Sequence, residues 1–502
     1  MQRAPRNRRP LHFVGSERAG DVEAITKDDR KRRGLFSRLP PCRTTVRAVV
    51  RHSKRLSCVA PCIRPPLLPN RAALGVGFAA ALLAVATPAR AQMATASCDG
   101  LVTPRLPVLY LAGPSTTEGS GVLPLVEIVA GAVAGLASAV YMPTPPCTAI
   151  QSLVASTPGD TAALYLNPAG GTTACAADAT PPDVAVSDIY PVTCTQNLGI
   201  APLTSAELDF IGPIQTSAII VPSSSSEKVI SADAAYVVFG FGAANYVVAP
   251  WSDPASIFVP NTLSGPLNLI GATVALSPGK WVGAKTSTLA STSALASALK
   301  ADAMPSAAIG ILPGSVSSQT SGIKVLAYQH SSQECGFLPD SDSIHFDKIN
   351  VRQGRYALWG PTHFIVHVDS AGTVLDRAGQ PSAILRTVLD ALAANGPSEP
   401  APGVAGDSGV YAQGDASAPV PVIDGEAFTQ AVASASFIPW CAMQVVRAKD
   451  GDPEASYQPS APCSCSFESA VGATTSFCAT CGTDADCTGI ARKCRYGYCE
   501  VQ

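Results

Sequence analysis

One stretch of the sequence combines residues that can hold an anion at the start of a helix. Residues 258–270 read FVPNTLSGPLNLI, which predicts the end of a strand and then a helix that begins at Ser264 and Gly265. The first turn of a helix carries free backbone N–H groups and a partial positive charge, which suit an anionic ligand. Pro266 follows and contributes no N–H group. Because Ser264 also suits an N-cap, the stretch is a working anion site, the remains of one or only a capped helix.

Four histidines in the second half of the chain are candidate metal ligands, namely His330, His345, His363 and His367. His363 and His367 are four residues apart, but they lie in a stretch predicted to be extended. They therefore do not form the helical H-E-x-x-H pair of a zinc protease. We favour a structural or solvent-facing role for these histidines over a metal site.

Three aspartates in PDSDSIHFDK, residues 339–348, could suggest a calcium loop: Asp340, Asp342 and Asp347. The glycine and the terminal glutamate of an EF-hand are missing, so an ordinary Asx-rich turn is favoured. The sequence shows no convincing Ser/His/Asp set or pair of catalytic carboxylates, and no cofactor motif. We therefore expect a protein that is not an enzyme and that carries no cofactor and no metal.

The elements that must position these residues alternate between strands and helices. Strands are predicted at 107–114 and 181–191, and Ser187 and Asp188 lie at the carboxyl end of the second. The β-α-β-α-β order over this region predicts a largely parallel sheet covered by helices on both faces. A second α/β set follows, and it ends with a clear amphipathic helix at 382–396.

The two ends of the chain differ from this α/β core in composition. Residues 1–71 are rich in Arg and Lys without apolar periodicity, and they are expected to be a disordered leader or to arise from a start codon assigned too early. Residues 72–91 have the apolar run and the Ala-Arg-Ala ending of a secretory signal peptide. After the core come a Gly/Pro/Ala linker at 396–424, a connecting segment at 425–462 and a cysteine-rich tail at 463–502.

Charge is divided unevenly between the leader and the rest of the chain. Residues 1–91 carry 19 basic and 5 acidic side chains, whereas the remainder carries 16 basic and 32 acidic ones. The exported part is therefore acidic, which disfavours a nucleic-acid partner because such binding needs a basic face. The apolar run is too short to span a bilayer, so we expect the chain to be peripheral to a membrane at most.

Cysteine usage agrees with export. Thirteen of the sixteen cysteines follow Ala91, and seven of these lie between Cys463 and Cys499. In an exported chain they predict disulfides rather than metal ligands. The C-x-x-C at 478–481 lies among many cysteines with no preceding strand, so it too is predicted to hold structural crosslinks. Because thirteen is odd, one thiol is left over or pairs with another chain.

A series of segments in the core, taken in order, resembles the phosphate-binding-protein-like branch of the type II periplasmic solute-binding proteins. The segments are LAGPSTTEG, PPCTAIQSL, DVAVSDIYP, ISADAAYVVFGFG, the Ser264–Gly265 turn, SAAIGILPG and FDKINVRQGRYALWGP. The resemblance covers about 104–395. It implies a two-lobe α/β fold, in which two mixed or parallel sheets are flanked by helices and joined by a hinge. Lobe 1 is expected at 104–192 and 325–395, and lobe 2 at 195–322.

Proteins of this family feed ABC importers and hold phosphate with short hydroxyls, backbone N–H groups at helix starts, one carboxylate and an arginine. The resemblance implies that the carboxylate, here that of Asp188, accepts a hydrogen from the protonated oxyanion. The family's ligand-binding positions fall on eight residues of this sequence: Ser115, Thr116, Thr117, Thr148, Ser187, Asp188, Ser264 and Gly265.

The third loop departs from the family pattern Arg-x-x-x-Ser-Gly-Thr. Pro260 stands at the arginine position and Pro266 at the threonine position. Charge-assisted hydrogen bonds of the kind an arginine makes contribute about 1.5–3 kcal/mol each. Since about 1.4 kcal/mol corresponds to tenfold in affinity, these changes predict phosphate binding weaker by about two to four orders of magnitude. The loop is interpreted as a decayed or repurposed anion site.

The sequence as a whole predicts an exported protein that binds a small polar ligand, phosphate or another oxyanion, in a cleft between its lobes. The membrane subunits of an ABC importer are the expected partners. The alternative is a non-transporting surface or secreted interaction protein on a degenerate phosphate-binding scaffold. The tail CGTDADCTGIARKCRYGYCE resembles cysteine modules of exported proteins from Gram-negative bacteria, so a periplasmic or extracellular location in such a bacterium is expected.

Overall fold

The computed structural model describes residues 96–501 apart from ten short gaps. These gaps are 103–105, 115–121, 160–161, 242–247, 285–286, 290, 394–410, 413–424, 474–477 and 490–491. The predicted leader at 1–71 and signal peptide at 72–91 lie outside the described residues, as does most of the predicted linker at 396–424.

A first sheet is built on three parallel strands. Residues Val108–Gly113 form β1, Ser138–Pro143 form β2 and Val184–Ser187 form β5, and β1 pairs in parallel with both of the others. A hairpin of β3, Ala162–Leu166, and β4, Thr172–Ala176, extends the sheet beyond β2 in the antiparallel sense. The β-α-β-α-β region thus gives the parallel core that its apolar strands predict.

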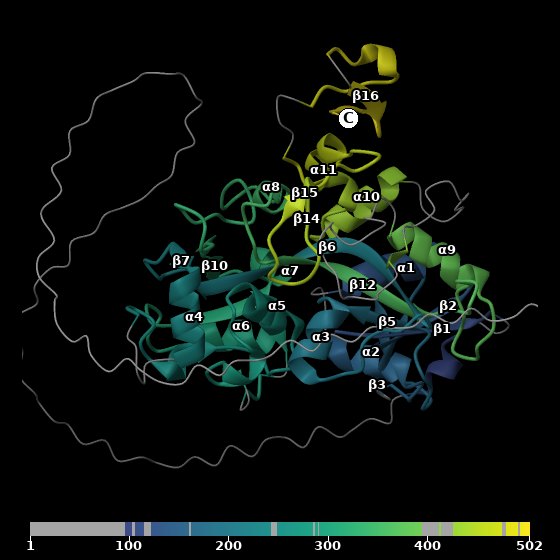
Figure 1. Cartoon of the computed structure of the whole chain (residues 1–502), viewed down its shortest axis with the longest axis horizontal. Helices are drawn as coiled ribbons and strands as arrows, with labels where there is room; N and C mark the ends of the chain where they lie inside the picture. Colours follow the sequence, from purple (N-terminus) through teal and green to yellow (C-terminus); the bar gives the residue numbers. More distant parts are fainter. Residues whose placement is uncertain are drawn as a thin grey trace, which may run out of the picture. The chain divides into compact units, whose positions relative to one another are not determined.

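Helices cover both faces of the first sheet, because successive side chains of its strands point to opposite sides. Leu109 and Leu111 of β1 pack with α1, Leu123–Ala132, and α9, Ala383–Leu392. On the other face, Tyr110 and Ala112 pack with α2 and α3. Figure 1 shows α1 and α9 on one side of the strands and α2 and α3 on the other. Residues Pro146–Val154 form α2, and Pro191–Leu198 form α3.

One long strand joins the first sheet to a second one. Residues Glu207–Pro222 form β6, and all sixteen of them are buried. Its residues 207–216 pair with β12, Trp359–His367, which also pairs with β5. Its residues 217–222 pair instead with strands of the second sheet. The change of sheet lies between 216 and 217, further along the chain than the predicted start of the second lobe at 195.

The second sheet carries helices of its own. Ile309–Pro313 form β9, which pairs with β6 and with the short β8, Ile257–Phe258, and β10, Ile323–Val325, pairs with the end of β6. Its helices are α4, Ala232–Phe241, α5, Gly265–Thr273, α6, Thr292–Lys300, and α7, Gly314–Gln319. Val229–Ser231 and Ala327–Gln329 form a separate parallel pair, β7 and β11. A four-residue helix, α8, Ile349–Arg352, precedes β12.

The strand order β4-β3-β2-β1-β5-β12-β6-β9-β8 therefore describes two α/β lobes that share β6. This confirms the predicted fold class: two mixed sheets flanked by helices and joined by β6, which passes from one lobe to the other. Within the described residues, no helix is both long and apolar enough to cross a membrane.

The C-terminal part adds short elements tied by disulfides. They are α10, Gly425–Ser434, α11, Ser464–Ala470, the β14–β15 pair at Val445–Val446 and Ala455–Ser456, and the hairpin of β16, Arg492–Arg495, and β17, Tyr498–Val501. A two-residue strand, β13, Tyr411–Ala412, pairs with β6.

Six disulfides use twelve of the thirteen cysteines that follow Ala91. The pairs are Cys98–Cys175, Cys147–Cys194, Cys441–Cys463, Cys465–Cys478, Cys481–Cys494 and Cys487–Cys499. Cys335 stands outside these pairs. The two cysteines of the C-x-x-C at 478–481 are bonded to other partners, which confirms that they are structural crosslinks.

Candidate functional site

Asp188 directly follows the last residue of β5, at the edge of the first sheet where the parallel strands finish. Its side chain is buried, with 6% of the residue exposed. The preceding hydroxyl, that of Ser187, is used inside its own turn: its Oγ donates to the carbonyl of Ile189 at 2.6 Å and accepts from the Ile189 N–H at 3.2 Å. Asp188 is therefore the polar side chain that this strand end presents to the second lobe.

Gly265, the first residue of α5, lies directly against the Asp188 carboxylate. A Cβ placed on Gly265 would lie 2.0 Å from Oδ1 and 2.2 Å from Oδ2. No side chain fits in that space, so glycine is required wherever these two elements meet in this way. The contact joins the first lobe, through β5, to the second lobe, through α5.

The start of α5 has the cap position that the sequence predicts. Ser264 is the N-cap residue with extended backbone angles, but its side chain makes no capping hydrogen bond. Asn268 stabilises the turn instead, because its Nδ2 donates to the carbonyls of Thr262 at 3.0 Å and Ser264 at 2.8 Å. The half-buried Ser264 hydroxyl is thus not committed to the helix, at the same end where Gly265 contacts Asp188.

Burial and a neighbouring acid determine the charge of Asp188. The pKa of Asp188 is raised from 3.8 to about 7, chiefly because the carboxyl is removed from water and partly because the carboxyl of Asp450 lies nearby. Its Oδ1 has no hydrogen-bond partner among the described residues. No described lysine or arginine forms an ion pair with it. A buried carboxylate oxygen without a donor leaves room in the hydrogen-bond pattern for a donor from a ligand.

Asp450 comes from the C-terminal part of the chain and was not among the predicted site residues. Its Oδ2 accepts from the N–H of Tyr190 at 2.9 Å and from the hydroxyl of Thr193 at 2.6 Å. Its pKa is also raised, chiefly by burial. It lies in the polar segment AKDGDPEA, which carries no motif, so the sequence offered no signal for it.

His363 lies in the same buried region, on β12. Its Nδ1 is 2.8 Å from Oδ2 of Asp209 on β6, and its ring meets that of Tyr190 edge-on at 4.5 Å. His367, four residues on, has its Nε2 at 3.0 Å from the carbonyl of Leu153. These contacts are the structural role that the sequence favours for the two histidines.

The other predicted site residues divide into two groups. Thr148 lies in the first turn of α2, at the edge of the sheet where β2 ends, and is partly buried. Its neighbour Cys147 is bonded to Cys194 and so ties α2 to α3. Ser115, Thr116 and Thr117 lie outside the described residues.

The structure therefore brings three of the eight predicted residues together: Asp188, Ser264 and Gly265. Ser187 is adjacent but turned into its own loop, and Thr148 lies on the same edge of the sheet. Asp188 and the two residues at the start of α5 come from different lobes, so the candidate site lies where the lobes meet.

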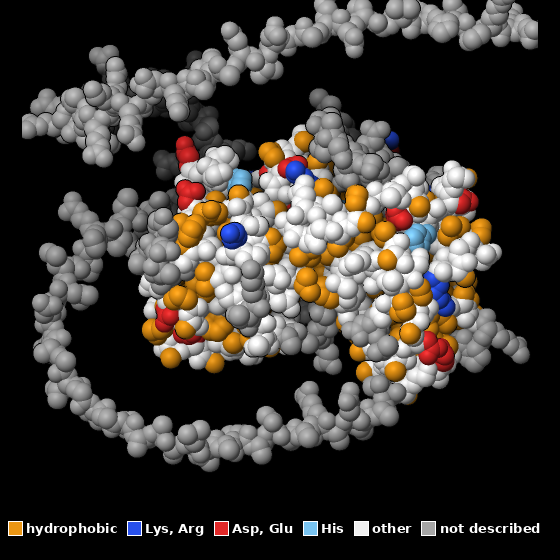
Figure 2. All heavy atoms as spheres, turned by 60° about the horizontal axis from the view of Figure 1, so that its bottom comes forward, with side chains coloured by type: hydrophobic (Ala, Val, Ile, Leu, Met, Phe, Trp, Pro, Cys, Tyr) orange, Lys and Arg blue, Asp and Glu red, His pale blue; other side chains and the backbone are white. Residues whose placement is uncertain are grey.

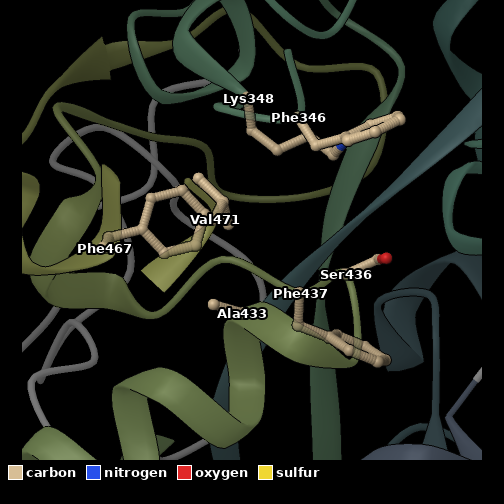
Figure 3. A pocket seen from close by; sticks show the side chains of 7 residues that line it. All are labelled: Phe346, Lys348, Ala433, Ser436, Phe437, Phe467 and Val471. Atoms are coloured by element: carbon tan, nitrogen blue, oxygen red, sulfur yellow. The ribbon is translucent and has the colours of Figure 1, made fainter. Parts of the chain in front are cut away.

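A small cavity lies elsewhere, between the 346–348 loop and the helices α10 and α11. It measures about 20 Å³ and is lined by Phe346, Lys348, Ala433, Ser436, Phe437, Phe467 and Val471 (Figure 3). This volume suits about one water molecule. It includes none of the predicted ligand-binding residues.

The Asp-rich turn at 339–348 is held by its own hydrogen bonds. Asp340 receives both the N–H and the ammonium group of Lys348 at 2.9 Å. Asp342 accepts from the N–H of Ile344 at 2.8 Å, and Asp347 accepts from that of Ser341 at 2.8 Å. These are the contacts of the predicted Asx-rich turn.

On the face drawn in Figure 2, charged side chains are few and scattered.

Comparison with known proteins finds distant structural neighbours and no sequence relative. No protein-family model matches the chain, and a search of curated proteins finds no match. One similar solved structure is a putative phosphate ABC transporter substrate-binding protein with bound phosphate from Clostridium perfringens. It is 9% identical with a TM-score of 0.39, and the match covers 66% of this chain and 99% of the Clostridium chain. An ABC-type phosphate transport receptor from Vibrio cholerae is 12% identical with a TM-score of 0.34, covering 52% and 88%.

The effector-binding domain of QuiR in complex with shikimate is similar to the same extent. It is 10% identical with a TM-score of 0.30, and the match covers 57% of this chain and 95% of that domain. At these levels of similarity, the description of the fold as two α/β lobes rests on its own strand order, and the ligand is a separate question.

Proposed function

We propose that the chain is an exported binding protein that takes a small polar solute between Asp188 and the start of α5. The observation that carries this proposal is the meeting of Asp188 and Gly265 across the two lobes, with Oδ1 of the buried carboxylate lacking a donor among the residues that the structure describes. A ligand that donates a hydrogen bond to Asp188 and offers negative charge to the helix start would satisfy both groups at once.

A protonated oxyanion such as hydrogen phosphate has both properties. Its hydroxyl donates to Asp188, and its other oxygens accept from backbone N–H groups and from the hydroxyl of Ser264. Thr148, Ser187 and the hydroxyls of Ser115, Thr116 and Thr117 remain proposed ligand residues on the strength of the family resemblance. Because Pro260 stands in place of an arginine, we expect weak binding of a free phosphate ion.

Ligand entry requires the lobes to separate. The Asp188 carboxylate and Gly265 are in contact, so a ligand can reach the space between them only after α5 has moved away from β5. The strand β6 runs from one lobe into the other and provides the connection about which such a movement takes place.

Six disulfides support the proposed export, since disulfides form and persist in oxidising compartments. A periplasmic or extracellular location, and delivery of the solute to ABC importer membrane subunits, are part of the proposal. Intact mass spectrometry of the chain recovered from an expressing Gram-negative bacterium tests the first point. It should give a chain that begins at Gln92 with twelve cysteines oxidised.

Thermal melting with inorganic phosphate tests the binding itself. A ligand at one hundred times its Kd stabilises a protein by about 2.7 kcal/mol, so millimolar affinity is detectable at high phosphate concentration. Sulfate is the matched control, because it is a tetrahedral oxyanion without a proton to donate at neutral pH. We expect phosphate to raise Tm, sulfate to raise it less and Asp188→Asn to reduce the phosphate effect. The same substitution at the exposed Asp233 should leave it unchanged.

A second function is favoured by one specific feature of the same contact. The Asp188 carboxylate itself occupies the place at the helix start where an anion would be held. A scaffold whose own carboxylate fills the anion position has no need of a solute there, which suits a non-transporting interaction protein. A folded chain whose Tm is unchanged by both oxyanions at high concentration would support this alternative and refute the first.

A further inference from the structure

Residues 438–463, here called the interlobe strap, begin on β6, the strand that joins the two lobes. Ile438 forms a two-bond bridge with Ile214 of β6: the N–H of Ile214 donates at 2.8 Å and that of Ile438 at 2.9 Å. Two residues on, Nε1 of the buried Trp440 donates to the carbonyl of Gly212 at 2.8 Å. The strap thus begins on the part of β6 just ahead of the point where the strand changes sheets.

Asp450 anchors the strap to the first lobe. Its Oδ2 receives the backbone N–H of Tyr190 and the hydroxyl of Thr193, both at the start of α3. The hydroxyl of Tyr190 in turn donates to the carbonyl of Arg447 at 2.7 Å. All four residues are buried, so these hydrogen bonds do not compete with water.

Gly451 anchors the strap to the second lobe. It has φ +79°, and a Cβ at this position would lie 2.5 Å from the carbonyl oxygen of Ala272 in the last turn of α5. Gly360 of β12 lies between α5 and Asp450 of the strap. A Cβ there would be 3.0 Å from Cδ1 of Leu269 on α5 and 3.3 Å from Oδ1 of Asp450. Consecutive residues of the strap therefore contact one lobe each.

The strap is itself held in shape. Cys441 and Cys463 close it with a disulfide, and both are buried. Within it, the guanidinium of Arg447 lies 4.0 Å from the ring centre of Trp359 on β12 and pairs with Glu454 at 2.5 Å. A closed loop with internal ion pairs loses little further conformational entropy when it binds both lobes, so its two anchors can act together.

We propose that the interlobe strap is a latch that keeps the two lobes closed on the Asp188–Gly265 contact. Opening the lobes requires Asp450 to leave Tyr190 and Thr193, or Gly451 to leave α5. The latch concerns the motion of the lobes with or without a ligand, so it goes beyond the proposed binding function. It makes this chain a module with slow opening rather than a freely opening receptor.

Hydrogen exchange on the ligand-free, disulfide-bonded full chain tests the latch. Asp450→Ala removes the first-lobe anchor, and the control Asp452→Ala changes a partly exposed carboxylate two residues away, whose lysine partner is 3.8 Å distant. Asp450 accepts two buried hydrogen bonds from the start of α3, so we expect Asp450→Ala to speed exchange about tenfold or more in the hydrogen-bonded amides of α3 and α5. Amides in the β1–β2 ladder should keep their rates in both variants.

A second variant covers the case in which Asp450→Ala loosens the whole fold and speeds exchange in the β1–β2 ladder as well. Thr193→Val removes only one donor to Asp450 and keeps the shape of the side chain. Faster exchange confined to α3 and α5 in either variant supports the latch. Unchanged exchange there in a folded Asp450→Ala protein, or in Thr193→Val where the first variant unfolds, overturns it. Because no ligand is present, this outcome is independent of the phosphate experiment.

Discussion

Asn197 donates from its Nδ2 to Oδ1 of Asn268 across 3.1 Å, joining α3 of the first lobe to α5 of the second. This hydrogen bond is a direct contact between the lobes, separate from both the strap and the Asp188–Gly265 pair. Asn268 is fully buried, whereas Asn197 is only partly buried. The two residues therefore differ in what they contribute, although they share one hydrogen bond.

Replacing Asn268 with alanine is expected to cost more stability than replacing Asn197. Asn268 also donates from its side chain to the carbonyls of Thr262 and Ser264, so Asn268→Ala removes three side-chain hydrogen bonds whereas Asn197→Ala removes one. A single ordinary hydrogen bond contributes about 1 kcal/mol, so the loss should be larger for Asn268→Ala. Urea unfolding of the two alanine variants measures the difference. Equal losses would contradict the assignment of Asn268 as the residue that holds this turn.

The contact of Gly265 with Asp188 predicts a strong coupling between two substitutions. Gly265→Ala places a methyl group where the carboxylate lies, and overpacking of this kind costs about 1–3 kcal/mol or more. In an Asp188→Ala background the methyl has room, so we expect Gly265→Ala to cost much less. A double-mutant cycle by chemical unfolding measures the coupling. Additive effects of the two changes would show that α5 and β5 do not touch in solution.

The raised pKa of Asp188 predicts a loss of stability as the pH rises. Between its unfolded pKa of 3.8 and its folded pKa of about 7, the native protein binds more protons at this group than the unfolded chain does. Stability is therefore greatest below about pH 4 for this group and falls as the pH increases to 7, by about 1.4 kcal/mol per pH unit.

Asp188→Asn isolates this contribution from the other buried acids, such as Asp183 and Asp340, whose pKa values are also raised. We expect the variant to match the wild type in unfolding free energy near pH 4 and to exceed it by several kcal/mol at pH 8. The difference grows by about 1.4 kcal/mol for each pH unit between the unfolded and the folded pKa of Asp188. Asp233→Asn, at an exposed position, serves as the control. Parallel pH profiles for the wild type and Asp188→Asn would refute the buried, shifted carboxyl.

Much of the fold follows from local patterns in the sequence. The apolar run at 107–114 forms β1, the extended stretch at 356–370 contains β12, and the amphipathic pattern at 382–396 contains α9. These predictions work because each element shows its own periodicity. The ends of strands and starts of helices are also readable, which is why Asp188 and Ser264 could be singled out before the lobes were known to meet there.

The parts that could not be predicted depend on contacts between distant segments. Asp450 is 260 residues from Tyr190, and nothing in its own segment marks it as a partner of the first lobe. Its place is fixed by the packing of Ile438 and Trp440 on β6, which is a property of the folded chain. Similarly, Gly265 is a common helix-start residue in the sequence, and only the structure shows that a carboxylate requires it.

The disulfides predict two different responses to mutation, according to where each one lies. Cys147–Cys194 joins α2 to α3 at the edge of the candidate site and spans 47 residues, whereas Cys487–Cys499 spans 12 residues in the tail. Loop-closure entropy gives about 4 kcal/mol for the first and about 3 kcal/mol for the second. Replacing both cysteines of the core pair with serine should lower the melting temperature of the two-lobe fold. The same change in the tail pair should leave that transition in place and increase hydrogen exchange only in β16 and β17. If removal of the tail pair lowers the main transition as much as removal of the core pair, then the tail is part of the cooperative unit.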